Sequence, residues 1–161
     1  MPNLIRGFVR AVQDLADPPA LVLAGSIRDA GVDAAVSEVP STVRVLRPGF
    51  LAFADLSGFL GGALVAAFPS RGEGFGLPVL EAMACGAPVL TTHRTSLPEV
   101  GGDAVAYTEP DDVSIAGALR ALLSSPERRQ VLSTAGMVRA REFTWEASAE
   151  AHLLSYQRAA E

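Results

Sequence analysis

The sequence predicts an α/β domain in which a parallel sheet is covered by helices on both faces. Three observations support this fold class. Short apolar runs alternate with helical segments along the first two thirds of the chain. These runs lack the polar–apolar alternation of a strand that has one solvent-exposed face. Of the 161 residues, 49% are hydrophobic and only 19% are charged. A chain this apolar needs elements that are buried on more than one face.

The predicted elements follow one another in a regular order. Apolar residues at helical spacing predict a first helix over residues 4–15, which Pro18 and Pro19 end. Continuous apolar runs predict strands at residues 21–24, 43–46, 64–68, 89–91 and 104–107. Helices are expected between them at residues 33–38, 51–60 and 77–85.

From Asp112 onward the pattern is helical only. Asp111, Ser125 and Thr144 stand where N-cap residues belong, because their side-chain oxygens can accept from the free amides of a first helical turn. We expect three closing helices, at about residues 112–124, 126–142 and 145–160. No internal repeat or linker divides the chain, so residues 1–161 are expected to form one domain.

Charge and composition exclude several classes of function. The chain has 13 basic and 18 acidic residues, a net charge of −5, and so lacks the basic surplus of nucleic-acid-binding domains. One cysteine, Cys85, excludes an internal disulfide and a thiolate zinc site, and two distant histidines, His93 and His152, make a histidine metal site unexpected. The longest uncharged stretch, residues 56–70, is shorter than the ~20 apolar residues of a membrane span. No signal peptide is visible, and we expect a cytoplasmic domain without a metal ion.

Residues 69–89, P-S-R-G-E-G-F-G-L-P-V-L-E-A-M-A-C-G-A-P-V, carry the functional signal. They join a predicted strand to a predicted helix through a loop with glycines at 72, 74 and 76. Such a loop lies at the carboxyl edge of the sheet, where open α/β folds bind ligands. Glycines let the backbone approach a ligand, and a helix that begins near Leu77 presents free N–H groups. The site suits a phosphate group or the polar edge of a sugar.

Glu81 is the only charged residue in a helix that is otherwise apolar all round and therefore expected to be buried. Burial of an unpaired carboxylate costs a free energy on the order of several kcal/mol, so Glu81 must be paired or must face a polar cavity. It either makes a structural ion pair, or lies at the surface, or accepts hydrogen bonds from ligand hydroxyls. Glu73, eight positions earlier, is either a second ligand-binding carboxylate or a solvated loop residue.

Three further features have both a structural and a functional interpretation. The pattern Ser96-x-x-Glu99 predicts a capping box ahead of a short helix, which makes Glu99 structural. Arg71 and Arg94 stand in loops at the predicted binding edge, where they could face a diphosphate, although exposed loop arginines are common. His93 ends a predicted strand, and we expect it to be solvated rather than near a ligand.

The run E-G-F-G-L-P-V-L-E from Glu73 to Glu81, followed by A-M-A-C-G-A-P-V, closely resembles the E-x7-E signature of retaining GT-B glycosyltransferases. Within these it is most similar to the group 1 family, family 4 of the sequence classification. The resemblance continues through S-L-P-E-V-G-G-D-A at residues 96–104, the pair Pro110-Asp111 and F-T-W-E at residues 143–146. It covers essentially the whole chain. It implies the C-terminal, Rossmann-like domain of the GT-B fold, which binds the nucleotide-sugar donor.

The resemblance also implies roles for individual residues. Glu81 would bind the ribose hydroxyls, and Glu73 would be the catalytic-site residue that contacts the hydroxyls of the transferred sugar. The N–H groups expected to hold the sugar and the diphosphate belong to Gly74, Phe75, Gly76 and Leu77. The loop around Gly49 resembles the segment beside the base. The family transfers sugar with retention and usually without a metal ion, so no cofactor is expected beyond the nucleotide-diphosphate sugar, which is the donor substrate.

Parts of the family pattern are absent. The donor domain normally begins with a strand, followed by an Arg and a Lys that grip the diphosphate; residues 1–5 resemble the helix just after that Lys. In the Rossmann order 3-2-1-4-5-6 the absent strand would lie in the middle of the sheet. The remaining strands would close the gap, pair with a strand of a second copy, or leave the domain marginally stable. The N-terminal acceptor domain is also expected to be absent, together with any peripheral membrane contact that it makes.

We therefore expect the donor-binding half of a retaining hexosyltransferase that is inactive by itself. The Leu-Pro-Glu segment and the C-terminal part look most like mannosyltransferases that use GDP-mannose. One alternative is a non-catalytic module that binds a nucleotide sugar or assembles with a partner subunit. A sugar-nucleotide epimerase of the same architecture is a weaker alternative, because the E-x7-E run matches transferases better. The acceptor and the product cannot be read from these residues.

Overall fold

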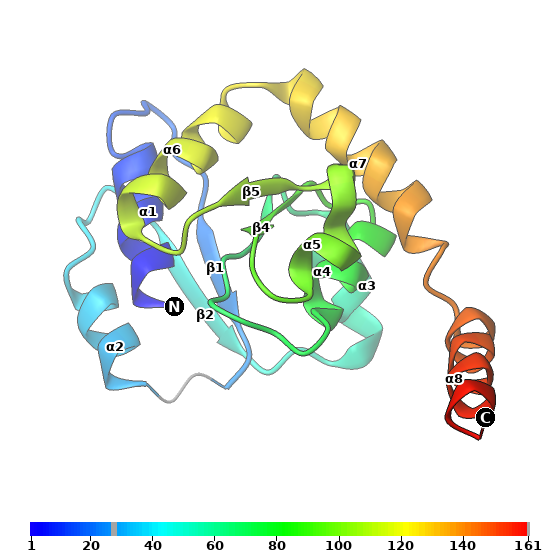
Figure 1. The fold of residues 1–161 in the computed structure, drawn as a ribbon. Coiled ribbons are helices and arrows are strands. Elements are labelled where there is room, and N and C mark those ends of the chain that lie inside the picture. The colour runs from blue at the N-terminus through cyan, green and yellow to red at the C-terminus, as the bar shows by residue number, and fades with distance from the viewer. Residues whose placement is uncertain (27–28, 161) are drawn as a thin grey trace.

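The computed structural model describes residues 1–26 and 29–160, and Figure 1 shows their arrangement. The strands are β1 (Leu21–Ala24), β2 (Val45–Gly49), β3 (Ala66–Phe68), β4 (Val89–Thr92) and β5 (Ala106–Thr108). The helices are α1 (Pro2–Val12), α2 (Ala30–Ser37), α3 (Phe53–Gly61), α4 (Leu77–Ala84), α5 (Leu97–Gly101), α6 (Asp112–Leu123), α7 (Pro126–Ala140) and α8 (Trp145–Ala159). A short 3-10 helix, η1 (Gly102–Ala104), follows α5.

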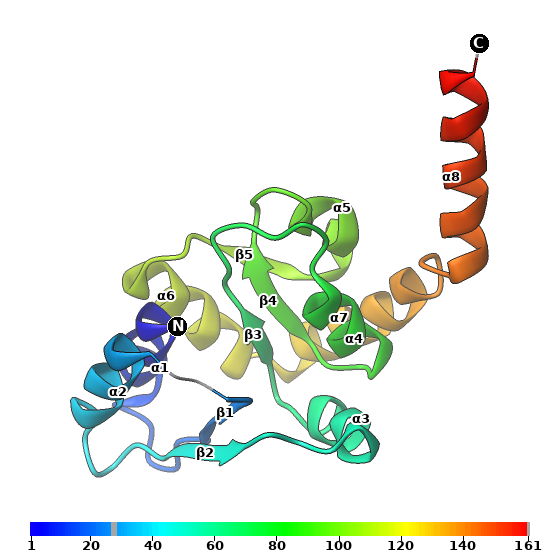
Figure 2. The same ribbon diagram turned by 90° about the horizontal axis from the view of Figure 1, so that it is seen from below.

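The strands form the middle layer of three. Helices α1, α2 and α6 lie on one side of the strands, and α3, α4 and α7 lie on the other (Figures 1 and 2). Every strand pair is parallel. The predicted α/β class, with a parallel sheet covered on both faces, is therefore confirmed.

The sheet is divided into two parts. β1 pairs with β2, with Leu21 opposite Val45, and β3, β4 and β5 form a separate sheet in which Ala66 lies opposite Val89. No strand of the described residues joins β1 to β3, and Figure 2 shows β1 and β2 set apart from the other three. The break falls where the Rossmann order places the strand that normally precedes the segment resembled by residues 1–5. The remaining strands have not closed this gap.

One hydrophobic cluster spans the break between the two half-sheets. It contains residues of α1 and α6, such as Phe8 and Ile115, together with Leu90 of β4, and Leu21 of β1 packs against it. A second cluster joins α4, α5 and α7 to the three-stranded sheet, and a third lies between α1, β1 and α2. The α1–α6 pair therefore holds together two sheets that share no backbone hydrogen bond among the described residues.

Several predicted boundaries are confirmed. The strand at residues 21–24 matches β1, and the capping side chains of Asp111, Ser125 and Thr144 each accept from the amide three residues later. Other boundaries were wrong by a few residues. The first helix ends at Val12 and excludes the exposed Leu15, and the strand expected at 43–46 is β2, Val45–Gly49. Isolated apolar residues at a helix or strand end do not show whether the backbone continues.

Helix α8 forms as predicted but buries none of its residues. It extends away from the rest of the domain in both views (Figures 1 and 2). Trp145, at its start, is 88% exposed. In the described part of the chain, no helix has the length and apolar character needed to cross a bilayer.

Candidate functional site

The glycine-rich loop, residues 69–76, joins β3 to α4 at the carboxyl edge of the three-stranded sheet. The loops that follow β4 and β5 reach the same edge, since Arg94 after β4 pairs with Glu109 after β5 over 2.6 Å. All three loops therefore converge where the strand directions place ligands in an open α/β fold.

Gly76 sets the start of α4. Its φ of +105° lies in the left-handed region, and a Cβ at this position would stand 2.7 Å from Cδ2 of Leu97. A side chain is therefore disfavoured both by the backbone conformation and by its neighbour. This glycine turns the chain so that α4 begins at Leu77, as the sequence predicts.

Four consecutive amides at this turn have no acceptor within residues 1–26 and 29–160. They belong to Gly74, Phe75, Gly76 and Leu77. They stand at the N-terminus of α4, where the helix dipole places partial positive charge. Free amides at a helix start are suited to bind phosphate or the hydroxyl and oxyanion edge of a polar ligand.

Helix α4 is not buried all round, and this part of the prediction was wrong. Val79, Ala82 and Met83 are buried, whereas Leu77 and Glu81, one turn apart on the same face, are exposed. An apolar composition does not tell which face of a helix a neighbour covers, and nothing in the described chain covers this one. Glu81 has no side-chain partner among the described residues, so its carboxylate is available at the surface beside the turn.

Glu73 lies in the middle of the loop and is half-buried. Its backbone N–H donates to Oγ1 of Thr95 over 2.9 Å, and its carbonyl accepts from Oγ of Ser96 over 2.9 Å. No ion pair involving its carboxylate occurs in the described part of the chain. The loop therefore holds the backbone of Glu73 and leaves its carboxylate available to a ligand.

The predicted capping box at Ser96 was wrong. Ser96 makes no capping hydrogen bond to α5, because its backbone is already helical (φ −78°, ψ −15°) instead of extended. Its hydroxyl turns to the glycine-rich loop and lies 2.9 Å from the carbonyl oxygens of both Glu73 and Phe75. Glu99 is exposed in the first turn of α5.

Two more hydroxyls bond to the same stretch of chain. Oγ1 of Thr91 donates to the carbonyl of Phe68 over 2.9 Å, and Oγ1 of Thr92 donates to the carbonyl of Ser70 over 2.5 Å. We call the four hydroxyl residues that bond to segment 68–75 the hydroxyl row; they are Thr91, Thr92, Thr95 and Ser96. Sequence reasoning missed it, although the run T-T-H-R-T-S directly after a buried strand is its visible signal.

The remaining candidate residues lie in different places. Arg71 is exposed in the glycine-rich loop and borders a hollow of about 400 Å³ at the first turn of α1. Arg94 is paired with Glu109, so its charge is partly neutralised. Gly49 ends β2 in the other half-sheet, where the next residue, Phe50, is 83% exposed. The structure therefore groups Arg71 with Glu73 and the four amides, and places Gly49 on a separate strand end.

Phe75 is supported from the C-terminal end of α7. Its ring meets the ring of Phe143 edge-on, with centroids 5.9 Å apart, and the Arg139 guanidinium lies 4.9 Å from the Phe143 centroid. Arg139 also donates to the carbonyl of Glu99 over 2.6 Å. Sequence reasoning missed this support, which gives Phe143 of the F-T-W-E segment a packing contact with the loop, whereas Trp145 is exposed.

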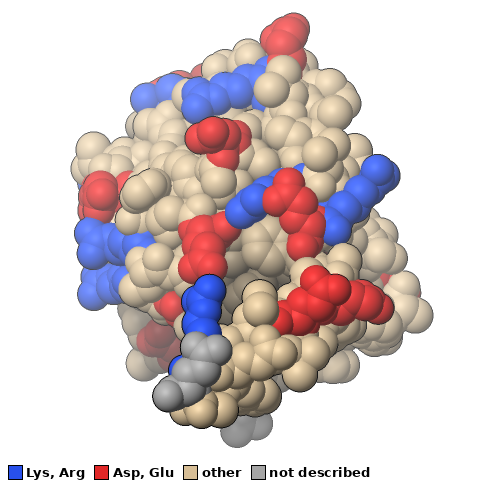
Figure 3. All heavy atoms as spheres, turned by 45° about the vertical axis from the view of Figure 1, so that its right-hand side comes forward, with Lys and Arg blue, Asp and Glu red and all other residues tan. Residues whose placement is uncertain are grey.

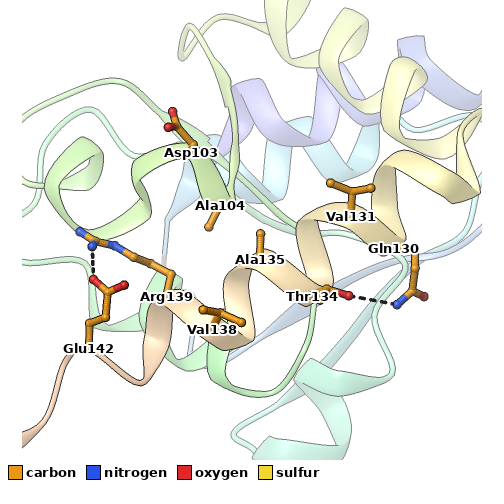
Figure 4. A pocket seen from close by; sticks show the side chains of 9 residues that line it. All are labelled: Asp103, Ala104, Gln130, Val131, Thr134, Ala135, Val138, Arg139 and Glu142. Atoms are coloured by element: carbon orange, nitrogen blue, oxygen red, sulfur yellow. Dashed lines mark hydrogen bonds and ion pairs between the residues drawn. The ribbon is translucent and has the colours of Figure 1, made fainter.

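A larger hollow of about 640 Å³ lies between η1 and α7 and contains none of the predicted site residues. Figure 4 shows Val131 and Val138 along one wall and the Arg139–Glu142 ion pair at one end. Size alone therefore does not identify the site.

The charged groups near the site are mixed in sign. Figure 3 shows acidic and basic side chains beside one another on the face that it displays.

His93 packs edge-on against Tyr107, with ring centroids 5.0 Å apart. Burial and the nearby Asp103 carboxylate raise the pKa of Tyr107, whose hydroxyl donates to the carbonyl of Gly102. Among the described residues, no three His, Cys, Asp or Glu side chains are grouped closely enough to hold a metal ion.

The sequence profile of the glycosyl transferases group 1 matches residues 3–125. The chain is 40% identical over 99 residues to O-antigen chain mannosyltransferase B of Escherichia coli, which covers 61% of this chain and 26% of that protein. It is 35% identical over 169 residues to D-inositol 3-phosphate glycosyltransferase of Geodermatophilus obscurus, which covers 94% of this chain and 36% of that protein. The chain therefore spans about a quarter to a third of the length of these relatives.

A solved structure agrees with the predicted architecture. HepE of Anabaena, determined in complex with UDP-glucose, superposes with a TM-score of 0.79 at 18% sequence identity, and the match covers 96% of this chain and 44% of that chain. At this identity the likeness concerns the fold. It confirms the Rossmann-like domain that the sequence predicts.

Proposed function

Since the chain belongs to the group 1 glycosyl transferases, we propose that it forms the donor-binding half of a retaining glycosyltransferase. In this proposal the glycine-rich loop and the first turns of α4 bind a nucleotide sugar, and the whole enzyme transfers its hexose to an acceptor. The observation that carries the proposal is one strand–loop–helix unit that presents four amides and two carboxylates, Glu73 and Glu81, without partners in the described chain.

Each group has a defined task in this proposal. The amides of residues 74–77 and the dipole of α4 stabilise the negative charge of the diphosphate, which grows as the bond to the sugar breaks. Glu81 accepts hydrogen bonds from the ribose hydroxyls, as acidic residues do in dinucleotide-binding folds. Glu73 accepts hydrogen bonds from hydroxyls of the transferred sugar. Arg71, exposed in the same loop, adds positive charge near the diphosphate.

We further propose that a strand outside this chain completes the sheet between β1 and β3, and that another domain binds the acceptor. The break in the sheet and the greater length of the relatives support this. The residues that would grip the diphosphate from that side are then supplied with the strand. By itself the chain binds the donor without transferring its sugar. A second copy of this chain that lends a strand is the competing way to fill the gap.

The proposed sugar is mannose, donated by GDP-mannose. The name of the Escherichia coli relative supports mannose, while the Anabaena protein was solved with UDP-glucose. The base must therefore be found by testing several nucleotides. We also propose that binding needs no metal ion, as the resemblance to the family implies, and that it takes place in the cytoplasm, as expected from a sequence without a visible signal peptide.

Calorimetric titration with GDP, UDP and ADP and with their sugars tests the proposal. If Glu81 binds ribose, Glu81→Ala weakens the binding of every nucleotide by about 1–3 kcal/mol, because a hydrogen bond to a charged group is lost. Glu150→Ala is the matched control, since Glu150 lies exposed on α8 and its removal changes the net charge equally. Equal affinities in wild type and Glu81→Ala would contradict the assignment.

A further inference from the structure

We propose that Thr95 and Ser96 are positioning residues whose hydroxyls fix the backbone of Glu73 and so determine where its carboxylate meets the sugar. This inference rests on the proposed function, because it concerns how the same loop is held. Neither residue needs to touch the ligand for the effect. Both act through Glu73.

The need for such residues arises from where the sheet ends. The pairing of β3 with β4 stops at Phe68 opposite Thr91, so the chain beyond Phe68 has no strand ladder to hold it. Thr91 and Thr92 extend the connection by bonding to the carbonyls of Phe68 and Ser70. The segment after β4 therefore continues to hold the segment after β3 through side chains in place of backbone groups.

Glu73 lies at a flexible point of the loop, because the residues on both sides of it restrict the backbone little. Its neighbours on both sides, Gly72 and Gly74, are glycines, which lose more conformational entropy on ordering than any other residue. Thr95 accepts from the amide of Glu73, and Ser96 donates to its carbonyl. These two bonds restrict the backbone of Glu73, and the single Ser96 hydroxyl hydrogen is shared with the carbonyl of Phe75, which lies equally close at 2.9 Å.

The backbone of Thr95 supports a specific role. Its φ is +50°, and it is the one residue other than glycine with positive φ in residues 1–26 and 29–160. A β-branched residue is a genuine outlier in this region, and such strain persists at sites where the surroundings require it. Glycine would relieve the strain but would lose the hydroxyl that accepts from Glu73. The hydroxyl bond to Glu73 is therefore a contact that glycine, the residue best suited to this backbone conformation, could not make.

The proposal predicts different effects on the binding of the nucleotide part and of the sugar part of the ligand. Glu81 lies on α4 and makes no bond to the hydroxyl row, and the Thr95 hydroxyl bonds to Glu73, so the nucleotide part should bind normally when the Thr95 hydroxyl is removed. The Ser96 hydroxyl also lies 2.9 Å from the carbonyl of Phe75, in the stretch whose amides meet the diphosphate, so Thr95 gives the cleaner separation. The sugar part, which meets Glu73, should bind less well. The ratio of the nucleoside-diphosphate Kd to the nucleotide-sugar Kd isolates this effect.

The experiment measures that ratio by calorimetry for wild type, Ser96→Ala and Thr95→Val, with the nucleotide that binds wild type best. Thr95→Val keeps the branched shape and removes only the hydroxyl. We expect the ratio to fall about tenfold in either variant, comparable to one hydrogen bond to a charged group, while the diphosphate Kd of Thr95→Val changes less than about threefold. Thr95→Ser, which keeps the hydroxyl, should restore the wild-type ratio.

Ser124→Ala is the matched control, because the Ser124 hydroxyl donates only to the carbonyl of Ala121 in α6. An unchanged ratio in both hydroxyl variants would overturn the inference and leave the proposed function standing. An equal fall in both affinities would show a merely structural role and would overturn it as well. Failure of wild type to bind any nucleotide or nucleotide sugar would overturn the proposed function itself, and the inference with it.

Discussion

The two half-sheets use the same parallel pairing, but they differ in the burial of their strands and in how firmly the loops beyond those strands are held. All four residues of β4 are buried between neighbours on both sides. In β1–β2 the pairing shifts register between Val22 and Ala24, and no residue of β2 is buried. Val22 and Leu46 are 37% and 50% exposed. β4 therefore has the burial of an interior strand, and β2 has that of an edge strand.

This difference in burial is matched by a difference in how firmly the segments beyond the strands are held. The glycine-rich loop projects from the buried half, and the fully buried hydroxyl residues Thr91 and Thr92 tie it to β4. The strand end at Gly49 projects from the exposed half, and apart from Gly49 itself and its two chain neighbours no atom of residues 1–26 and 29–160 lies within 4 Å of the place where its Cβ would stand. Exposed apolar side chains beside an unpaired strand edge are a recognised mark of an interaction surface. Val22 belongs to β1, the strand that borders the gap, and so fits the proposed strand between β1 and β3, whereas Leu46 lies on β2, beyond β1.

The largest expected effect tests the burial difference. Leu90→Ala removes a side chain with 0% exposure from β4, and the resulting cavity should lower the free energy of unfolding by about 2–5 kcal/mol. The same substitution at the half-exposed Leu46 of β2 should cost less than about 1 kcal/mol. Urea unfolding of both variants measures the difference. Similar losses of stability at the two positions would mean that β2 is buried in solution, and would contradict the difference in burial between β2 and β4.

A second, smaller effect compares one glycine from each half, at the end of β2 and in the loop after β3. Gly76→Ala and Gly49→Ala both place a side chain on a left-handed backbone, at a cost of about 1–2 kcal/mol each. Only Gly76 adds a contact, at 2.7 Å from Leu97, and overpacking of this kind costs roughly 1–3 kcal/mol more. Thermal unfolding should therefore rank Gly76→Ala well below Gly49→Ala. The reverse ranking would show that the loop relaxes freely around Leu97.

The smallest effect concerns α6, which packs on α1 across the break. Hydrogen bonds from the backbone and side chain of Ser114 lower the pKa of the capping residue Asp111 below its ordinary value of 3.8. A group whose pKa is lowered on folding contributes stability above its unfolded pKa and loses it as the pH falls through its folded pKa. The stability difference between wild type and Asp111→Ala should therefore be largest near neutral pH and should fall in acid to the contribution of an uncharged cap.

Ser125→Ala provides the control for this pH dependence. The Ser125 hydroxyl caps α7 in the same way but does not titrate. Its loss should destabilise the protein equally across the pH range. Urea unfolding at pH 7 and at pH 3 or below distinguishes the two variants. A constant effect of Asp111→Ala at all pH values would show that its charge contributes nothing to the cap.

Local signals in the sequence predicted much of the fold. The strand Leu21–Ala24, the caps at Asp111, Ser125 and Thr144, and the start of α4 at Leu77 all depend on residues within a few positions of one another. Composition and periodicity are sufficient for such features, because caps and helix starts are decided by neighbouring side chains and amides.

The candidate site was predicted less completely. Its glycines and carboxylates were identified from the sequence, whereas the partners of Ser96 were not. The hydroxyl of Ser96 had two possible partners, the amides of its own helix and a loop more than 20 residues away, and only the backbone angles decide between them. The same limit applies to Glu81, whose exposure depends on whether any element covers that face of α4.

By itself, the sequence determined the order of strands and helices, the caps, and the position of the E-x7-E run at the turn from β3 to α4. Only the tertiary structure decided that the sheet divides between β1 and β3, that α4 leaves one face exposed, and that Thr95 and Ser96 hold Glu73. The physical reason is the separation along the chain between the residues that interact. Periodicity and capping are local, while burial and hydrogen-bond pairing join residues that only the folded chain brings together.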